Sequence, residues 1–117
     1  MDLLSSLFGP PLPSITVKEL SEKLKSSSKP LVVDVREPEE YQAGHIAGAK
    51  LMPLGTLNQR VNELPKDTEI VCVCASGSRS SSATKMLISA GYAAVNMNGG
   101  MFTWQRAGLP VKKGGMA

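Results

Sequence analysis

A cysteine and an arginine enclose the stretch of this sequence that is best suited to chemistry. Cys74 ends an apolar run, and the segment CASGSR, which reaches from Cys74 to Arg79, carries only small side chains between them. Small residues let a backbone turn tightly, and Gly77 can adopt the positive φ that a tight turn needs. Where such a loop leads into a helix, its successive N–H groups can converge on the sulfur of Cys74. We therefore predict an anion-binding loop around a thiol.

A loop of this kind favours the thiolate over the thiol and provides a nucleophile at neutral pH. Arg79 adds a permanent positive charge. We expect Arg79 to hold a carboxylate that locks the loop, with Asp34 and Glu37 as candidates; contact with a substrate is the alternative. Read alone, the segment also fits a buried structural cysteine before a serine-rich helix. Cys72, which lies within the preceding strand, is expected to be a core residue.

The elements that must position this loop alternate between strand and helix. Short apolar runs predict strands at residues 31–35, 49–52, 70–73 and 93–97. Capping residues, prolines and glycines bound predicted helices at residues 17–25, 38–43, 57–64, 79–90 and 100–107. This alternation implies right-handed crossovers and a mainly parallel α/β sheet with helices on both faces. Ligands of such folds bind beyond the carboxyl ends of the strands, where Cys74 lies.

Composition indicates one ordinary globular domain. The 117 residues are 42% hydrophobic and 20% charged, which is typical of a folded chain and sufficient for one core. Three parts are expected: a flexible amino-terminal arm at residues 1–13, a domain at residues 14–110 and a flexible tail at residues 111–117. Aromatic residues make up only 4%, which argues against nucleic-acid binding, and the net charge of +3 suits a small anionic substrate.

The two cysteines and residues 1–13 give an expectation for the cellular compartment of the protein. Cα atoms two residues apart in a strand are separated by about 7 Å, at the limit of disulfide geometry. Free thiols and a reducing, cytoplasmic compartment are therefore expected. The segment MDLLSSLFGPPLP lacks a basic start and a long apolar run, so neither a signal peptide nor a membrane span is predicted. Its apolar residues are expected to pack on the domain, with partner docking as the alternative, and a monomer is expected.

Three segments, in order, resemble motifs of the single-domain rhodanese-like sulfurtransferases. DVREPEEYQAGHIAGA, at residues 34–49, is similar to the family's D-x-R…E-[FY]-x-x-G-H-[IL]-x-G-A signature. CASGSRS, at residues 74–80, is similar to its C-x-x-G-x-R-S loop, and NGGMFTWQRAGLP, at residues 98–110, to its G-G-x-x-x-W…G-L-P ending. The resemblance covers residues 14–110 and implies a three-layer α/β/α fold with a mainly parallel five-stranded sheet.

The resemblance also implies roles for individual residues. It makes Cys74 the nucleophile that takes sulfane sulfur from a donor and passes it on through a persulfide. The loop around the sulfur comprises Ala75, Ser76, Gly77, Ser78, Arg79 and Ser80. Pocket support is expected from the end of the adjacent strand, at Asp34, Arg36 and Glu37. A purely structural ion-pair network is the alternative to substrate contact for this group.

Other matched residues are expected to be structural. His45, the only histidine, falls in a G-H-I segment that is structural in the family, which indicates a hydrogen-bonded role rather than a general base. Trp104 and the Gly99-Gly100 pair are expected to serve packing and a tight turn. Ala75 departs from the family pattern, because many relatives carry a larger polar or basic side chain there. This departure weakens the case for thiosulfate as the physiological donor.

The function expected from the resemblance is sulfur transfer through a Cys74 persulfide. The donor would be thiosulfate or another small anionic sulfur compound such as a persulfide, and the acceptor cyanide, a thiol or a protein cysteine. No metal or organic cofactor is required. One alternative is a persulfide carrier or binding module for a partner protein. Another is a cysteine phosphatase or arsenate reductase, although those enzymes use a loop one residue longer than the four residues between Cys74 and Arg79.

Overall fold

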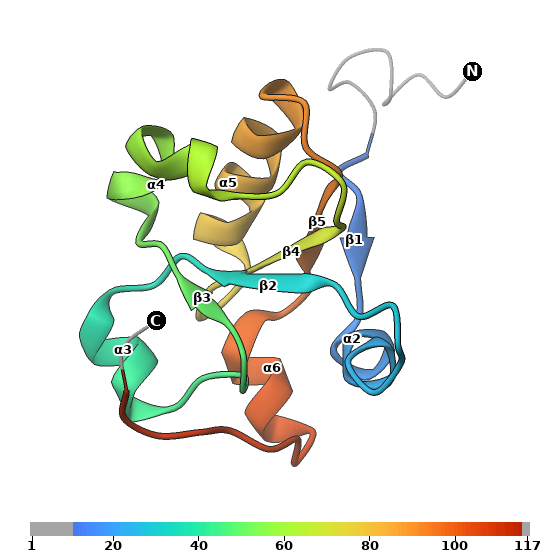
Figure 1. The fold of residues 1–117 in the computed structure, drawn as a ribbon. Helices are drawn as coiled ribbons and strands as arrows, with labels where there is room; N and C mark the ends of the chain where they lie inside the picture. The colour runs from blue at the N-terminus through green and yellow to red at the C-terminus, as the bar shows by residue number, and fades with distance from the viewer. Residues whose placement is uncertain (1–10, 116–117) are drawn as a thin grey trace.

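Five short parallel strands form the centre of the chain, which we describe from a computed structural model for residues 11–115 (Figure 1). The strands are β1 (Ser14–Ile15), β2 (Leu31–Asp34), β3 (Lys50–Leu51), β4 (Ile70–Val73) and β5 (Ala94–Met97). Their order across the sheet is β1-β5-β4-β2-β3, and every neighbouring pair is parallel. The central strand β4 is buried at all four positions. The predicted α/β fold with a mainly parallel five-stranded sheet is confirmed.

Helices cover both faces of this sheet. They are α2 (Val17–Lys23), α3 (Pro38–Ala43), α4 (Leu54–Arg60), α5 (Ser78–Ser89) and α6 (Gly100–Arg106), with a 3₁₀ turn η1 (Val61–Glu63) after α4. Figure 1 shows α4 and α5 on one side of the sheet and α2 and α6 on the other. Alternate residues of β4 enter the two cores: Val71 and Val73 pack with Leu20 and Trp104, whereas Cys72 packs towards α5. None of the described helices is long and apolar enough to cross a membrane.

Three local features differ from the prediction. Strand β1 was absent from it, because two residues after a proline give no pattern, yet the amide of Asn96 donates to Pro13 and the amide of Asn98 donates to Ile15. Helix α4 begins at Leu54 instead of residue 57, since Pro53 is its N-cap, and residues 61–63 tighten into η1. Both shifts lie at element ends, where periodicity says least.

Part of the segment predicted as a flexible tail is hydrogen-bonded to the domain. Lys112 forms an isolated antiparallel bridge with His45, and the amide of Gly114 donates to the carbonyl of Gln42 at 2.7 Å. These contacts join the chain after α6 to the end of α3. Residues 1–10 and 116–117, which belong to the predicted arm and tail, lie outside the described residues.

Candidate active site

The sulfur of Cys74 lies inside a loop whose polar hydrogens point at it. Cys74 follows β4 directly, and its Sγ accepts hydrogen bonds from the Gly77 amide at 3.1 Å and from both the amide and the hydroxyl of Ser80 at 3.3 Å. Gly77 has a φ of 105°, a left-handed conformation that favours glycine, and it is the N-cap of α5. The loop therefore winds around the sulfur and the amino end of a twelve-residue helix begins beside it.

The two cysteines have opposite ionisation behaviour. Burial acts to raise the pKa of Cys74, but hydrogen bonds from the Ser80 hydroxyl and from the amides of Ser80, Gly77 and Ser76 outweigh it, so the pKa lies below its usual value. Burial raises the pKa of Cys72 to about 11. Both cysteines are free and Cys72 is buried, as expected; Cys74 is buried as well. The hydrogen bonds around Cys74 thus favour its thiolate, whereas burial favours the neutral thiol of Cys72.

Arg79 locks the loop to α3 through a carboxylate that was not among the two expected from the sequence. Its Nη1 and Nη2 donate to the two carboxylate oxygens of Glu40 at 2.8 and 2.9 Å. The hydrogen bonds from Arg79 lower the pKa of Glu40 to about 2. Asp34 and Glu37 were the wrong partners: Asp34 is already paired with Arg36, and Glu37 is the exposed N-cap of α3, one turn before Glu40.

Asp34 and Arg36 form a buried ion pair. Arg36 Nη2 donates to Asp34 Oδ2 at 2.8 Å and Nε donates to Oδ1 at 2.9 Å, while only 1% of Asp34 and 5% of Arg36 is exposed. Arg36 Nη2 also donates to the carbonyl of Gly44 at 2.8 Å. The pair joins the end of β2 to the end of α3, so the geometry describes the structural alternative rather than a pair facing a substrate.

The amino end of α6 holds the loop from the other side. The amide of Met101 donates to the carbonyl of Cys74 at 2.8 Å, and the amide of Phe102 donates to that of Ala75 at 3.0 Å. Gly100 makes this approach possible: a Cβ at Gly100 would lie 2.6 Å from the Cys74 carbonyl oxygen, closer than such atoms come. The glycine pair therefore does more than turn the chain. The sequence analysis missed this role of Gly100, as it missed Glu40 as the partner of Arg79.

Each missed residue left a trace in the sequence. Glu40 stands three residues after the N-cap Glu37, at the capping-box position, and its Oε1 accepts the Glu37 amide at 3.0 Å. Gly99 and Gly100 are consecutive glycines before a helix, which is a signal for close backbone approach. Neither signal identifies its partner, because both partners are far along the chain.

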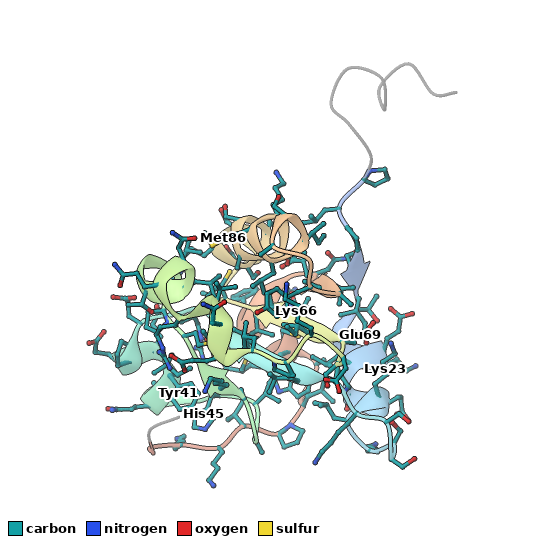
Figure 2. All side chains as sticks on the ribbon, turned by 45° about the horizontal axis from the view of Figure 1, so that its top comes forward. Lys23, Tyr41, His45, Lys66, Glu69 and Met86 are labelled. Carbon is teal, nitrogen blue, oxygen red and sulfur yellow. The ribbon has the colours of Figure 1, made fainter. Side chains whose placement is uncertain are left out.

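His45 and Trp104 have structural roles, as predicted. The His45 ring stacks on Tyr41 with ring centroids 3.6 Å apart, and its Nδ1 is hydrogen-bonded to the Tyr41 carbonyl at 2.7 Å. Figure 2 shows the two side chains next to each other. Trp104 is buried and its Nε1 donates to the carbonyl of Pro110 at 2.9 Å. In the described part of the chain, neither the His45 ring nor the Trp104 ring donates a hydrogen bond to the sulfur of Cys74.

The fold and site define an α/β domain with a cysteine at the carboxyl end of its central strand, wrapped by amides, and comparison with known proteins identifies its family. Residues 16–107 match the family model of the rhodanese-like domain. The chain is 39% identical over 98 residues to a sulfurtransferase of Allochromatium vinosum, covering 83% of this chain and 92% of that protein. A solved rhodanese-related protein from Thermoplasma volcanium superimposes with a TM-score of 0.81 at 34% identity, covering 86% of this chain and 97% of that one.

A third relative is longer. The putative sulfur carrier protein YrkF of Bacillus subtilis is 37% identical over 94 residues, and the match spans 80% of this chain but only 51% of YrkF. The chain belongs to the rhodanese-like family of sulfurtransferases.

The hydrogen bond from the Ser80 hydroxyl should be measurable as a change in the ionisation of Cys74. Ser80→Ala removes one donor from the sulfur without adding bulk, so the pKa of Cys74 should rise. Ultraviolet absorbance of the thiolate, titrated against pH, gives the midpoint. The matched control is Ser82→Ala, an exposed position on the same helix, and an equal shift in both variants would contradict the assignment.

The contribution of Glu40 to stability should depend on pH. Its pKa falls from 4.5 to about 2 on folding, so the stabilisation is complete above pH 4.5 and is lost as pH falls towards 2. Glu40→Gln should lower the free energy of unfolding at pH 7 by about 1 kcal/mol, because the pair is partly exposed and screened. The difference from wild type should shrink in urea titrations near pH 3. Glu39→Gln, at an exposed neighbour, should show no such pH dependence.

Two glycines provide a test of the close approach by α6. Gly100 has a φ of 62° and faces the loop carbonyls, so Gly100→Ala should destabilise the fold by at least about 1 kcal/mol. Gly55 lies inside α4, and a Cβ added there would meet no atom within 4 Å, so Gly55→Ala should stabilise by roughly 0.5–1 kcal/mol. Urea unfolding of both variants distinguishes them. Equal effects would mean that the approach of α6 is not fixed by Gly100.

Proposed function

We propose that this protein transfers sulfane sulfur through a persulfide on Cys74. The observation that carries the proposal is the convergence of three hydrogen-bond donors, from Gly77 and Ser80, on a buried sulfur. Donors placed where negative charge resides need no reorganisation during the reaction, which is the basis of electrostatic preorganisation. These donors stabilise the Sγ thiolate before transfer and again when Sγ leaves as a thiolate.

The first half-reaction loads the sulfur. The Cys74 thiolate attacks the outer sulfur of a donor, and a new S–S bond forms as the bond to the leaving group breaks. With thiosulfate the bonding electron pair departs on sulfite; with a donor persulfide it departs on a thiolate. Cys74 then carries a persulfide anion. The charge remains on sulfur throughout, so the site needs no separate general base, in keeping with the structural role of His45.

The second half-reaction removes the outer sulfur from Cys74. A thiophilic acceptor attacks the outer sulfur, the S–S bond to Cys74 breaks, and its electron pair returns to Sγ as the thiolate. Cyanide yields thiocyanate, and the thiolate of a small molecule or a protein cysteine yields a new persulfide. The donors around Sγ stabilise the departing thiolate in this step.

The position of Arg79 supports sulfur transfer over phosphate ester hydrolysis. Both terminal nitrogens of its guanidinium donate to Glu40, so the charge of Arg79 is already paired with a carboxylate. A phosphatase would need this charge on the oxygens of its substrate. The loop, with four residues between Cys74 and Arg79, also leaves little room for a tetrahedral phosphate.

A second candidate function is that of a persulfide carrier. Cys74 has no exposed surface, which protects a stored sulfur and restricts small acceptors. The similarity to a protein described as a putative sulfur carrier is in keeping with this candidate. A carrier would load the persulfide and release it slowly to small acceptors, whereas an enzyme would turn over.

Intact-protein mass spectrometry after brief incubation with thiosulfate, or with a small-molecule persulfide, tests the proposal. Wild type and Cys72→Ser should each gain about 32 Da, the mass of one sulfur, and Cys74→Ser should gain nothing. Cyanide should then remove the added mass as thiocyanate, rapidly for an enzyme and slowly for a carrier. Loading that survives in Cys74→Ser, or no loading with either donor, would refute the persulfide mechanism. Hydrolysis of an aryl phosphate that requires Cys74 would favour the phosphatase instead.

A further inference from the structure

Phe102 is an exposed aromatic side chain that the fold does not use. It is 67% exposed, and among the described residues the other exposed large hydrophobic side chain is Ile88, at 42%. Leaving an aromatic side chain in water forgoes on the order of 2 kcal/mol of burial. A side chain with so little packing contributes little to stability, and an exposed hydrophobic residue of this kind can mark an interaction site.

The backbone places Phe102 at the edge of the active loop. Phe102 lies in the first turn of α6, and its amide donates to the carbonyl of Ala75, the residue after Cys74. The left-handed Gly100 fixes the distance between α6 and the loop. The aromatic residue is thus tied to the site by one hydrogen bond, while Ile88 lies near the far end of α5, about 15 Å along the helix from Ser78.

Arg106 accompanies Phe102 on the exposed side of α6. The guanidinium carbon of Arg106 lies 5.9 Å from the centroid of the Phe102 ring, a cation–π contact between residues one turn apart. Within residues 11–115 no carboxylate forms an ion pair with Arg106. An aromatic ring beside an arginine that forms no such pair has the composition of an interface hot spot.

The loop residues after Cys74 have small side chains. Ala75 presents only a methyl group, and the next residue, Ser76, is small and exposed. Cys74 itself has no exposed surface, so an acceptor must bring its sulfur nucleophile down to the persulfide. Small side chains at the rim leave room for the backbone of an incoming segment.

We propose that Phe102 and Arg106 form a docking site for an acceptor protein that presents a cysteine flanked by an apolar and an acidic side chain. The apolar side chain packs on Phe102 and Ala75, and the acidic one pairs with Arg106. The acceptor thiolate then attacks the outer sulfur of the Cys74 persulfide as in the second half-reaction. This inference rests on the proposed function and specifies its acceptor.

Two synthetic peptides test the site on the full chain. In one the cysteine is flanked by leucine and glutamate, and in the other by serine and glutamine. Persulfide-loaded protein is mixed with each peptide or with cyanide, and kcat/KM for sulfur transfer is measured. Wild type should prefer the leucine and glutamate peptide by roughly tenfold, the effect of one good anchor. Phe102→Ala should lower the ratio of that peptide's rate to the cyanide rate by a similar factor.

The matched control is Ile88→Ala, which removes the other exposed hydrophobic side chain and should leave the ratio unchanged. A third peptide keeps leucine and replaces glutamate by glutamine. Arg106→Gln should reduce the preference for the glutamate peptide over this third peptide and leave the preference for leucine over serine unchanged. Equal use of both peptides by wild type would overturn the docking site. So would a Phe102→Ala variant that loses peptide and cyanide transfer in equal proportion, or the same dependence on Phe102 with a small apolar thiol.

A binding measurement separates this inference from the proposed function. A serine replaces the cysteine of the leucine and glutamate peptide, and NMR titration gives its affinity for unloaded protein. Phe102→Ala should weaken binding roughly tenfold. If wild type fails to load sulfur but this loss of affinity is seen, the proposed function is wrong and the docking site stands. If sulfur loads and turns over but affinity does not change, only the docking site is wrong.

Discussion

A buried charge on sulfur needs hydrogen-bond donors, and this requirement organises the structure around Cys74. Removal of a thiolate from water disfavours its charged form, so a site without donors would hold a neutral thiol. Here the donors come from Gly77 and Ser80, within six residues of the cysteine. A short loop can deliver them only if one residue is left-handed and a helix begins at once, and these conditions are met by Gly77 and α5.

The loop keeps this conformation because separate parts of the chain hold its outer side. Glu40 of α3 binds Arg79, and the amides of Met101 and Phe102 of α6 bind the carbonyls of the first two loop residues. The buried pair of Asp34 and Arg36 in turn connects β2 to the end of α3. Amides in the loop can thus point inward because its carbonyls and its arginine have partners elsewhere.

The parts of the fold and of the site that could be predicted from the sequence are those whose pattern lies within a few adjacent residues. The Cys74 loop, the strand before it and helix α5 follow from adjacent residues, since small side chains, an apolar run and helical spacing are read within one window. The two-residue strand β1 has no pattern of its own and exists because β5 offers an edge. The choice of Glu40 over Asp34 and Glu37 depended on competition: Arg36 occupies Asp34, and only the tertiary arrangement decides which carboxylate Arg79 reaches.

The burial of the second cysteine, Cys72, bears on the stability of the proposed Cys74 persulfide. Cys72 lies in β4, Cys74 follows the strand directly, and both side chains face the same core. A reactive thiolate at Cys72 could attack the inner sulfur of a Cys74 persulfide, form a disulfide and expel hydrosulfide. Burial keeps Cys72 protonated, and a neutral thiol is a poor nucleophile. Extended backbone also separates the two Cα atoms by about 7 Å, at the limit for a disulfide. In the proposed mechanism both features disfavour this internal route, so the sulfur on Cys74 leaves with an external acceptor.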